Sequence, residues 1–224
     1  MAVESEPVTQ PIRVVIVDDH PIVREGLIQL IDAEDDLRVV GEAEDAHAAM
    51  DEIQKVQPDI AIVDISLKGI NGVELIKNLK IRHPRLPVLV LSMHDEALYA
   101  ERALRAGARG YIMKQEATER VMEAIRRVMR GEIHLSEKIA SRMLHKIVDA
   151  GAQAVQSPIE LLSDRELEVF QLIGRGVGTR EIAEELHLSI KTVESHRANI
   201  KKKLQLKTAT ELMRYALQWV QGEE

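Results

Sequence analysis

Several side chains that can hold a metal ion or an anion follow short apolar runs in the first half of the chain. The pair Asp18-Asp19 follows IRVVIV, Asp64 follows IAIV, and Ser92 and Lys114 follow two later runs. Carboxylates packed close together raise one another's pKa unless a cation lies among them. Mg²⁺ suits such a cluster, because it binds one or two carboxylates and leaves room for water and phosphate oxygens. A hydroxyl and an amine beside the ion predict chemistry on a phosphoryl group, with a carboxylate as nucleophile.

A second group of residues suits contact with nucleic acid. Residues 188–207 hold six Lys or Arg and one acid, so this segment has a local net charge of +5. Val193, Ile200 and Leu204 share one helical stripe, opposite a face of small, polar and cationic side chains. A lysine-rich face alone is more often merely solvated, but here it follows a helix-turn-helix pattern, which fits the major groove of duplex DNA. We expect DNA contacts from Thr179, Arg180, Lys191, Thr192, Glu194, Ser195, Arg197, Ala198, Lys201 and Lys202.

Alternating strands and helices must position the first group of side chains. The pattern predicts strands at 12–17, 37–43, 60–63, 88–91 and 110–113. Helical periodicity fills the stretches between and after them, at 21–31, 46–56, 72–80, 96–106 and 118–130. This predicts an α/β, flavodoxin-like, doubly wound parallel sheet of five βα units, which binds ligands beyond the carboxyl ends of its strands. Any one of these polar residues alone could simply cap a helix or face solvent. Their joint placement at strand ends supports a shared site.

The second half of the chain has a different character. Residues 131–157 read as a linker with one helix, which Ser136 would cap. After Pro158 the pattern is all helical, and Ser163 with Glu166 forms the signature of a capping box. We therefore expect a phosphoryl-handling domain at 12–130, the linker, and an all-α helix-turn-helix domain at 158–224.

Composition excludes several classes of function. The net charge of −7 is unevenly spread, since residues 1–130 hold 17 basic and 23 acidic side chains. Without cysteine there is no disulfide, thiol nucleophile or cysteine zinc site. Five aromatic residues make a base-stacking platform for single strands improbable. No apolar run approaches the roughly 20 residues of a membrane span, and the start lacks the features of a signal peptide. The expected protein is cytoplasmic and has no membrane partner.

The first half also carries a family resemblance. The segments VVIVDDH, VDISL, VLVLS and GARGYIMK resemble the receiver domain of two-component response regulators over residues 12–130. The resemblance implies that Asp64 accepts a phosphoryl group and that Mg²⁺ is the cofactor. It further implies that Asp19 binds the ion directly, Asp18 binds it through water, and the Ser66 carbonyl completes the protein ligands.

The same resemblance assigns the residues that respond to phosphorylation. Ser92 would hydrogen-bond the phosphoryl group, Lys114 would pair with it, and Tyr111 would change rotamer with the switch. Gln115 follows Lys114 where many receivers have proline, which raises a question of loop geometry.

The segment from LSDRELEVF to KKKL resembles the LuxR-type DNA-binding domain of NarL/FixJ regulators over residues 160–220. Thr179-Arg180 and Glu194 depart from the usual pattern and affect the expected target sequence. The whole chain then resembles a transcriptional response regulator. Its implied partners are a sensor histidine kinase, promoter duplex DNA, a second copy on activation, and RNA polymerase as a further candidate. The apolar stripe of the last helix serves either the core or a dimer surface.

Two alternatives belong to other classes. A Mg²⁺-dependent phosphatase with an aspartyl-phosphate intermediate would need a second acid two residues after its nucleophile, where this chain has Ser66. A LuxR-type regulator that senses a small molecule would need an aromatic-lined cavity. We expect no enzymatic activity beyond the receiver's own phosphotransfer and dephosphorylation.

Overall fold

A computed structural model describes residues 10–67, 71–149 and 158–221. The chain divides into two compact units, residues 1–141 and 142–224. The predicted boundaries at 130 and 158 stay predictions, and linker residues 150–157 lie outside the described residues.

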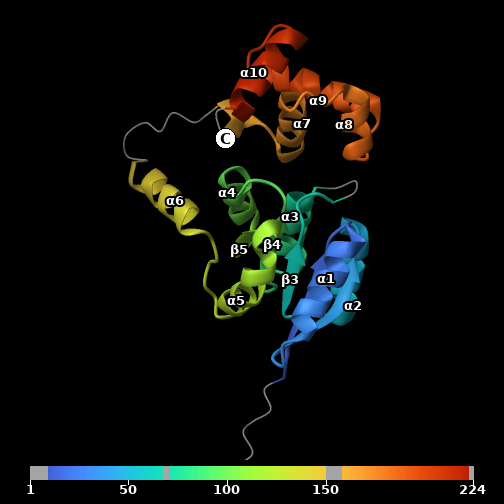
Figure 1. The fold of residues 1–224 in the computed structure, drawn as a ribbon, viewed down its shortest axis with the longest axis vertical. Coiled ribbons are helices and arrows are strands. Elements are labelled where there is room, and N and C mark those ends of the chain that lie inside the picture. The colour runs from blue at the N-terminus through green and yellow to red at the C-terminus, as the bar shows by residue number, and fades with distance from the viewer. Residues whose placement is uncertain (1–9, 68–70, 150–157, 222–224) are drawn as a thin grey trace, which may run out of the picture. The chain divides into compact units, whose positions relative to one another are not determined.

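The first unit is built on a five-stranded parallel sheet (Figure 1). Its strands are β1 (Ile12–Val17), β2 (Leu37–Ala43), β3 (Ile60–Val63), β4 (Val88–Ser92) and β5 (Gly110–Met113). They lie in the order β2-β1-β3-β4-β5. The chain therefore reverses its direction of progress between β1 and β3, and ligands of such sheets bind beyond the carboxyl ends of the strands at that point. The predicted doubly wound fold is confirmed.

Helices cover both faces of this sheet, which is why its inner strands β3 and β4 are buried and almost entirely apolar. They are α1 (Pro21–Asp32), α2 (Ala46–Val56), α3 (Gly72–Arg82), α4 (Glu96–Ala106) and α5 (Ala117–Met129). Helices α1 and α5 bury one set of alternating strand residues in a shared core, which includes Ile16, Ile62 and Leu91. Right-handed crossovers place α2, α3 and α4 on the other face, and α3 contacts both of its neighbours there.

Side-chain caps explain where three of these helices begin. Asp45, Asn71 and Asp95 each accept a hydrogen bond from a backbone N–H in the first turn of α2, α3 and α4. Such caps satisfy donors that have no partner inside the helix. The structure ends α3 at Arg82, two residues beyond the predicted end, and begins α5 at Ala117, one residue earlier than predicted.

The segment after α5 pairs with the sheet, which the sequence analysis did not predict. Tyr111 N–H donates to the His134 carbonyl at 2.9 Å, and His134 N–H donates to the Arg109 carbonyl at 3.0 Å. Gly110 permits this approach, because a Cβ at that position would lie 3.1 Å from the His134 Cβ. Ser136 then caps α6 (Glu137–Asp149), as predicted, by accepting from Ile139 N–H at 3.3 Å.

The second unit is helical in its described residues. A short 3-10 turn (Pro158–Leu161) precedes α7 (Asp164–Gly174), α8 (Thr179–Glu185), α9 (Ile190–Lys203) and α10 (Ala209–Gln221). The predicted capping box at Ser163 and Glu166 is present at the start of α7. Phe170 of α7 lies in the core, with ring-centroid distances of 5.9 Å to Tyr215 and 5.5 Å to Trp219 of α10. Part of the apolar stripe of α10 therefore serves the core.

Candidate functional site

Three strands deliver charged side chains to the carboxyl end of the sheet. Asp18 follows β1 and Asp64 follows β3, and each is 2% exposed. Lys114 follows β5, and its Nζ lies 2.6 Å from Asp18 Oδ2 and 2.7 Å from Asp64 Oδ2. The structure thus brings these predicted residues together in a single buried cluster.

Close backbone packing fixes the position of Asp64. Its N–H donates to the Val17 carbonyl at 2.8 Å, so the ends of β1 and β3 are joined beside the two carboxylates. Gly72 at the start of α3 packs against the loop after β3, where a Cβ would come 2.0 Å from the Asp64 carbonyl oxygen. Only glycine fits there without moving that loop.

Burial dominates the electrostatics of the cluster. It raises the pKa of Asp64, although the Lys114 ammonium opposes the shift, and the charge of Asp18 adds to it. Burial alone would lower the pKa of Lys114, but the Asp64 charge and hydrogen bonds to both carboxylates raise it. Lys114 therefore carries its charge at neutral pH and partly compensates two buried acids.

The cluster has unsatisfied oxygen atoms. Within the described part of the chain, the buried Asp19 Oδ1 and Asp64 Oδ1 have no hydrogen-bond partner. Asp18, Asp19, His20 and Asp64 each offer one ligand atom, and the four atoms lie within 4.8 Å of one another. Unpaired buried acceptors are costly, and a divalent cation would satisfy them. These four side chains could therefore hold a divalent metal ion.

His20 is the residue of this cluster that the sequence analysis missed. Its Nδ1 lies 3.1 Å from Asp18 Oδ1 and 2.7 Å from Asp19 Oδ1. The available signal was adjacency alone, since histidine follows the acidic pair directly in the sequence.

Ser66 enters the site in a different way from the expected one. The Ser66 backbone acts to lower the pKa of Asp64, although burial outweighs it. The Ser66 Oγ lies 2.9 Å from His94 Nε2. The role of the Ser66 carbonyl as a metal ligand stays a prediction.

The two expected switch residues meet at His94. Ser92 is fully buried, and its Oγ accepts from His94 N–H at 3.2 Å. The Tyr111 hydroxyl donates to the His94 carbonyl at 2.8 Å. Burial raises the pKa of Tyr111, so this phenol is neutral and available as a donor. The loop after β4 is thereby tied to the end of β4 and to β5.

The candidate nucleic-acid face lies on α8 and α9. Ser189 caps α9 by accepting from Thr192 N–H at 3.0 Å, and Val193 and Ile200 are fully buried. The opposite side of α9 is exposed at Lys191, Glu194, Ser195, Ala198 and Lys202, whereas Thr192, Arg197 and Lys201 are half-buried. In α8, Arg180 is exposed and Thr179 is half-buried.

Lys203 of the same basic run has a structural partner. Its Nζ lies 2.6 Å from Glu166 Oε2, and this carboxylate also belongs to the capping box of α7. Burial alone would raise the pKa of Glu166, but Lys203 and Ser163 lower it. Lys203 is exposed like Lys202, but its ammonium group is engaged with Glu166 within the unit.

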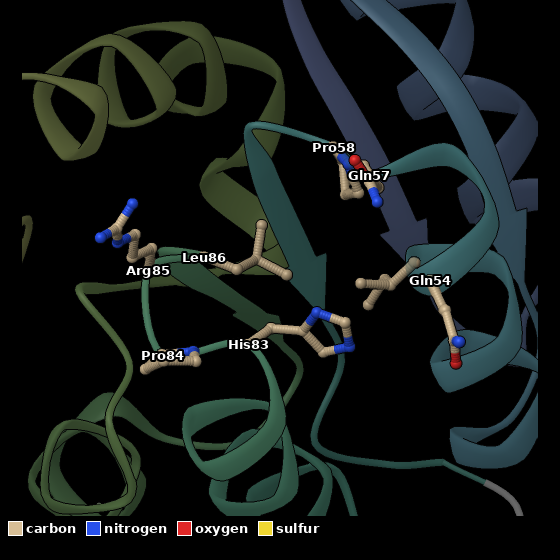
Figure 2. Close-up of a pocket in the computed structure, with 8 residues that line it drawn as sticks. Gln54, Gln57, Pro58, His83, Pro84, Arg85 and Leu86 are labelled. Atoms are coloured by element: carbon tan, nitrogen blue, oxygen red, sulfur yellow. The ribbon is translucent and has the colours of Figure 1, made fainter.

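A separate hollow of about 320 Å³ lies at the other end of the sheet, before β3 and β4 (Figure 2). Its walls come from the end of α2 and from the loop between α3 and β4. It is lined by Ile53, Gln54, Gln57, Pro58, His83, Pro84, Arg85 and Leu86. No Phe, Tyr or Trp is among these described lining residues.

Two families match this chain. Residues 14–126 match the response regulator receiver domain, and residues 160–216 match the bacterial regulatory proteins of the luxR family. Among curated relatives, the oxygen regulatory protein NreC of Staphylococcus carnosus is 38% identical over 209 residues, which cover 92% of this chain and 96% of the relative. NreC of Staphylococcus aureus is 36% identical with the same coverage.

Solved structures of a response regulator are similar to this chain over nearly its whole length. RcsB of Salmonella typhimurium is similar with a TM-score of 0.65 at 30% identity, covering 94% of this chain and 98% of that one. RcsB bound to the promoter rprA in the presence of the phosphomimetic BeF3⁻ has a TM-score of 0.60 at 30% identity, covering 92% and 98%. These neighbours agree with the sheet topology and the helical second unit described above.

Proposed function

Because this chain belongs to the NarL/FixJ response regulators, which join a receiver domain to a LuxR-type helix-turn-helix domain, we propose that phosphorylation of Asp64 controls its binding to promoter DNA. The phosphoryl group would come from a sensor histidine kinase. Mg²⁺ or a related divalent ion would assist its transfer.

This proposal rests mainly on the surroundings of the two carboxylate oxygens of Asp64. One of its oxygens is held by Lys114 at 2.7 Å, while the other is buried and has no donor in the described part of the chain. A carboxylate with one fixed and one unpaired oxygen is a prepared nucleophile.

The proposed transfer is a single displacement. An oxygen of Asp64 attacks phosphorus, the P–N bond of a phosphohistidine on the kinase breaks, and the leaving imidazole takes up a proton. Asp18, Asp19 and Asp64 would hold the ion, and its charge would offset the negative charge on the oxygens of the transferred group. Lys114 already lies within 2.7 Å of Asp64, so it can pair with the new phosphoryl oxygens.

The added charge of roughly −1.5 to −2 gives the receiver its switch. The Ser92 hydroxyl can turn from His94 N–H toward the phosphoryl oxygens. His94 also accepts from the Tyr111 hydroxyl, so a change at Ser92 reaches β5 through this loop. Phosphorylation would thus shift the population between two arrangements of the receiver surface.

The output is duplex DNA, contacted by the exposed face of α9. RcsB structures include two dimers bound to two parallel DNAs, and we propose that this chain likewise binds promoter half-sites as a homodimer. RNA polymerase is a further proposed partner. In the described residues no helix is long and apolar enough to cross a membrane. A cytoplasmic location is proposed from the promoter target.

The structure lends no support to the two alternative functions. A phosphatase would place an acid at residue 66, but Ser66 bonds His94 instead. A small-molecule sensor would need an aromatic-lined cavity, and the hollow in Figure 2 has no such lining among its described residues. We propose that the chain turns over no separate substrate.

A phosphorylation assay on the full chain tests the proposal. Incubation with acetyl phosphate and Mg²⁺ should produce a phosphorylated species on a phosphate-affinity gel and strengthen the shift of promoter DNA. Asp64→Asn should abolish both effects. Asp59→Asn is the matched control, because Asp59 lies at the opposite end of β3 and accepts from Arg13 N–H, which an asparagine can also do. Unchanged phosphorylation in Asp64→Asn would refute the assignment.

A further inference from the structure

The imidazole of His20 lies among the proposed metal ligands. Its Nδ1 is 2.7 Å from Asp19 Oδ1, but the two groups are not aligned for a hydrogen bond, so that oxygen stays unsatisfied. Nδ1 also lies 3.1 Å from Asp18 Oδ1. A ring nitrogen thus lies beside one of the two unpaired oxygens, Asp19 Oδ1.

The backbone holds His20 in this place. Pro21 is the first residue of α1, and a following proline restricts His20 to the extended region, where its φ is −96° and its ψ is 107°. His20 N–H donates to Asp18 Oδ1 at 2.9 Å, which fixes the turn after β1. The ring is therefore attached to a restrained backbone.

Lys114 pairs with one oxygen of each of two carboxylates, Oδ2 of Asp18 and Oδ2 of Asp64. Asp18 Oδ1 accepts from His20 N–H, whereas Asp64 Oδ1 has no hydrogen-bond partner among the described residues. The ligand atoms of Asp18, Asp19, His20 and Asp64 lie within 4.8 Å of one another. Opposite ligands of an octahedral ion with bonds of 2.0–2.1 Å are separated by about 4.2 Å. Small side-chain movements would bring the donors onto one ion.

We propose that His20 Nδ1 is a ligand of the divalent ion bound by Asp19 and Asp64, and that it makes this centre favour first-row transition ions such as Mn²⁺ over Mg²⁺. Imidazole suits transition metals, whereas Mg²⁺ prefers oxygen ligands. The His20 side chain is 58% exposed, so its ring has room to turn toward an ion held by the neighbouring carboxylates. The proposal rests on the metal site of the proposed function.

Pulsed electron paramagnetic resonance of the full chain loaded with Mn²⁺ tests it directly. The wild type should show coupling of Mn²⁺ to a ¹⁴N nucleus, which ¹⁵N-histidine labelling changes to the ¹⁵N pattern. His20→Ala should lose this coupling. His47→Ala is the matched control, because the His47 side chain is 90% exposed on α2, and it should keep the coupling.

Titration calorimetry gives a second readout. The ratio of Mn²⁺ to Mg²⁺ affinity should fall about tenfold in His20→Ala, as is usual when a metal site loses a supporting group. Mn²⁺ binding without nitrogen coupling, or coupling lost in His94→Ala instead, would overturn the role of His20 and leave the proposed function intact. Failure of the wild type to bind either ion would overturn the metal site itself.

Discussion

At the scale of single residues, the balance among Asp18, Asp64 and Lys114 determines what the site can do. Two buried carboxylates share one ammonium group, so the cluster is short of positive charge. Such a site stores an unfavourable electrostatic energy that a cation or a change of charge relieves. We therefore expect the cluster to lower the stability of the folded receiver when no cation is bound.

This balance predicts how stability depends on pH. The pKa of Asp64 in the folded protein is raised above its usual value of 3.8. At pH values between 3.8 and the raised pKa, the folded state therefore binds more protons than the unfolded state. Stability contributed by this residue is then lost as pH rises through that interval. Asp64→Asn should raise the free energy of unfolding at pH 7 without metal, and the gain should shrink as pH falls toward 4. Urea denaturation at several pH values measures it.

Asp36→Asn supplies a control of opposite sign. A hydrogen bond from Arg126 lowers the pKa of Asp36, so its contribution to stability is present above pH 3.8 and lost at lower pH. The variant should lose at most about 1 kcal/mol at neutral pH, because the ion pair lies at the surface. If the stability of Asp64→Asn depended on pH in the same way as that of Asp36→Asn, burial would not be the dominant influence on the pKa of Asp64.

The aspartates and Lys114 could be predicted from sequence because each directly follows a strand, and parallel strands all end at one edge of the sheet. His20 could not be predicted, since its contribution depends on the turn that its own N–H makes with Asp18. The link from Ser66 to His94 joins two loops that are 28 positions apart, and no local pattern predicts it.

At the scale of elements, caps and close approaches set the geometry around the site. The strands were predictable from their apolar runs, and helix ends were predictable to within about two residues. The pairing of His134 with β5 was not predictable, because one pair of backbone hydrogen bonds leaves no periodic pattern in the side chains.

The contact of α3 with the loop after β3 yields a prediction. Gly72→Ala places a Cβ 2.0 Å from the Asp64 carbonyl oxygen, so the loop must move. The cost should be about 1–3 kcal/mol of stability, as for other overpacked positions, together with slower phosphorylation by acetyl phosphate. Circular dichroism in urea and a phosphate-affinity gel measure the two effects.

Gly26→Ala is the matched control for this substitution. Gly26 lies within α1, and no atom is within 4 Å of the position of an added Cβ. Alanine should therefore stabilise that helix by roughly 0.5–1 kcal/mol and leave the phosphorylation rate unchanged. Equal effects of the two substitutions would contradict the close approach at Gly72.

At the scale of the whole molecule, the net charge of −7 is an average over segments of opposite local charge. The acidic excess belongs mostly to the receiver, whereas residues 188–207 carry a local charge of +5. This separation was visible in the sequence. Which lysines remain available for DNA was not visible, because the pairing of Lys203 with Glu166 joins positions 37 residues apart.

The lysines of α9 should accordingly differ in their effects on DNA binding. Lys202→Ala removes an exposed cation, so the slope of log affinity against log salt for a random duplex should fall by about 1. Lys203→Ala should leave this slope nearly unchanged. It should instead lower the free energy of unfolding by about 1 kcal/mol, because Glu166 loses its ion pair with Lys203. Fluorescence anisotropy measures binding, and the emission of Trp219, the only tryptophan, follows unfolding of the second unit. Equal salt slopes in both variants would refute the distinction.

The backbone pairing of His134 with β5 also covers part of the exposed edge of the sheet. β5 is the last strand of the sheet, and a bare outer strand is a template on which another chain can add and aggregate. The His134 backbone occupies the Tyr111 N–H and the Arg109 carbonyl on that side. A chain that ended at Arg130 would expose both groups, whereas one that ended after Ser141 would keep them covered. We therefore expect a receiver ending at Arg130 to self-associate through this edge of the sheet more readily than one ending after Ser141.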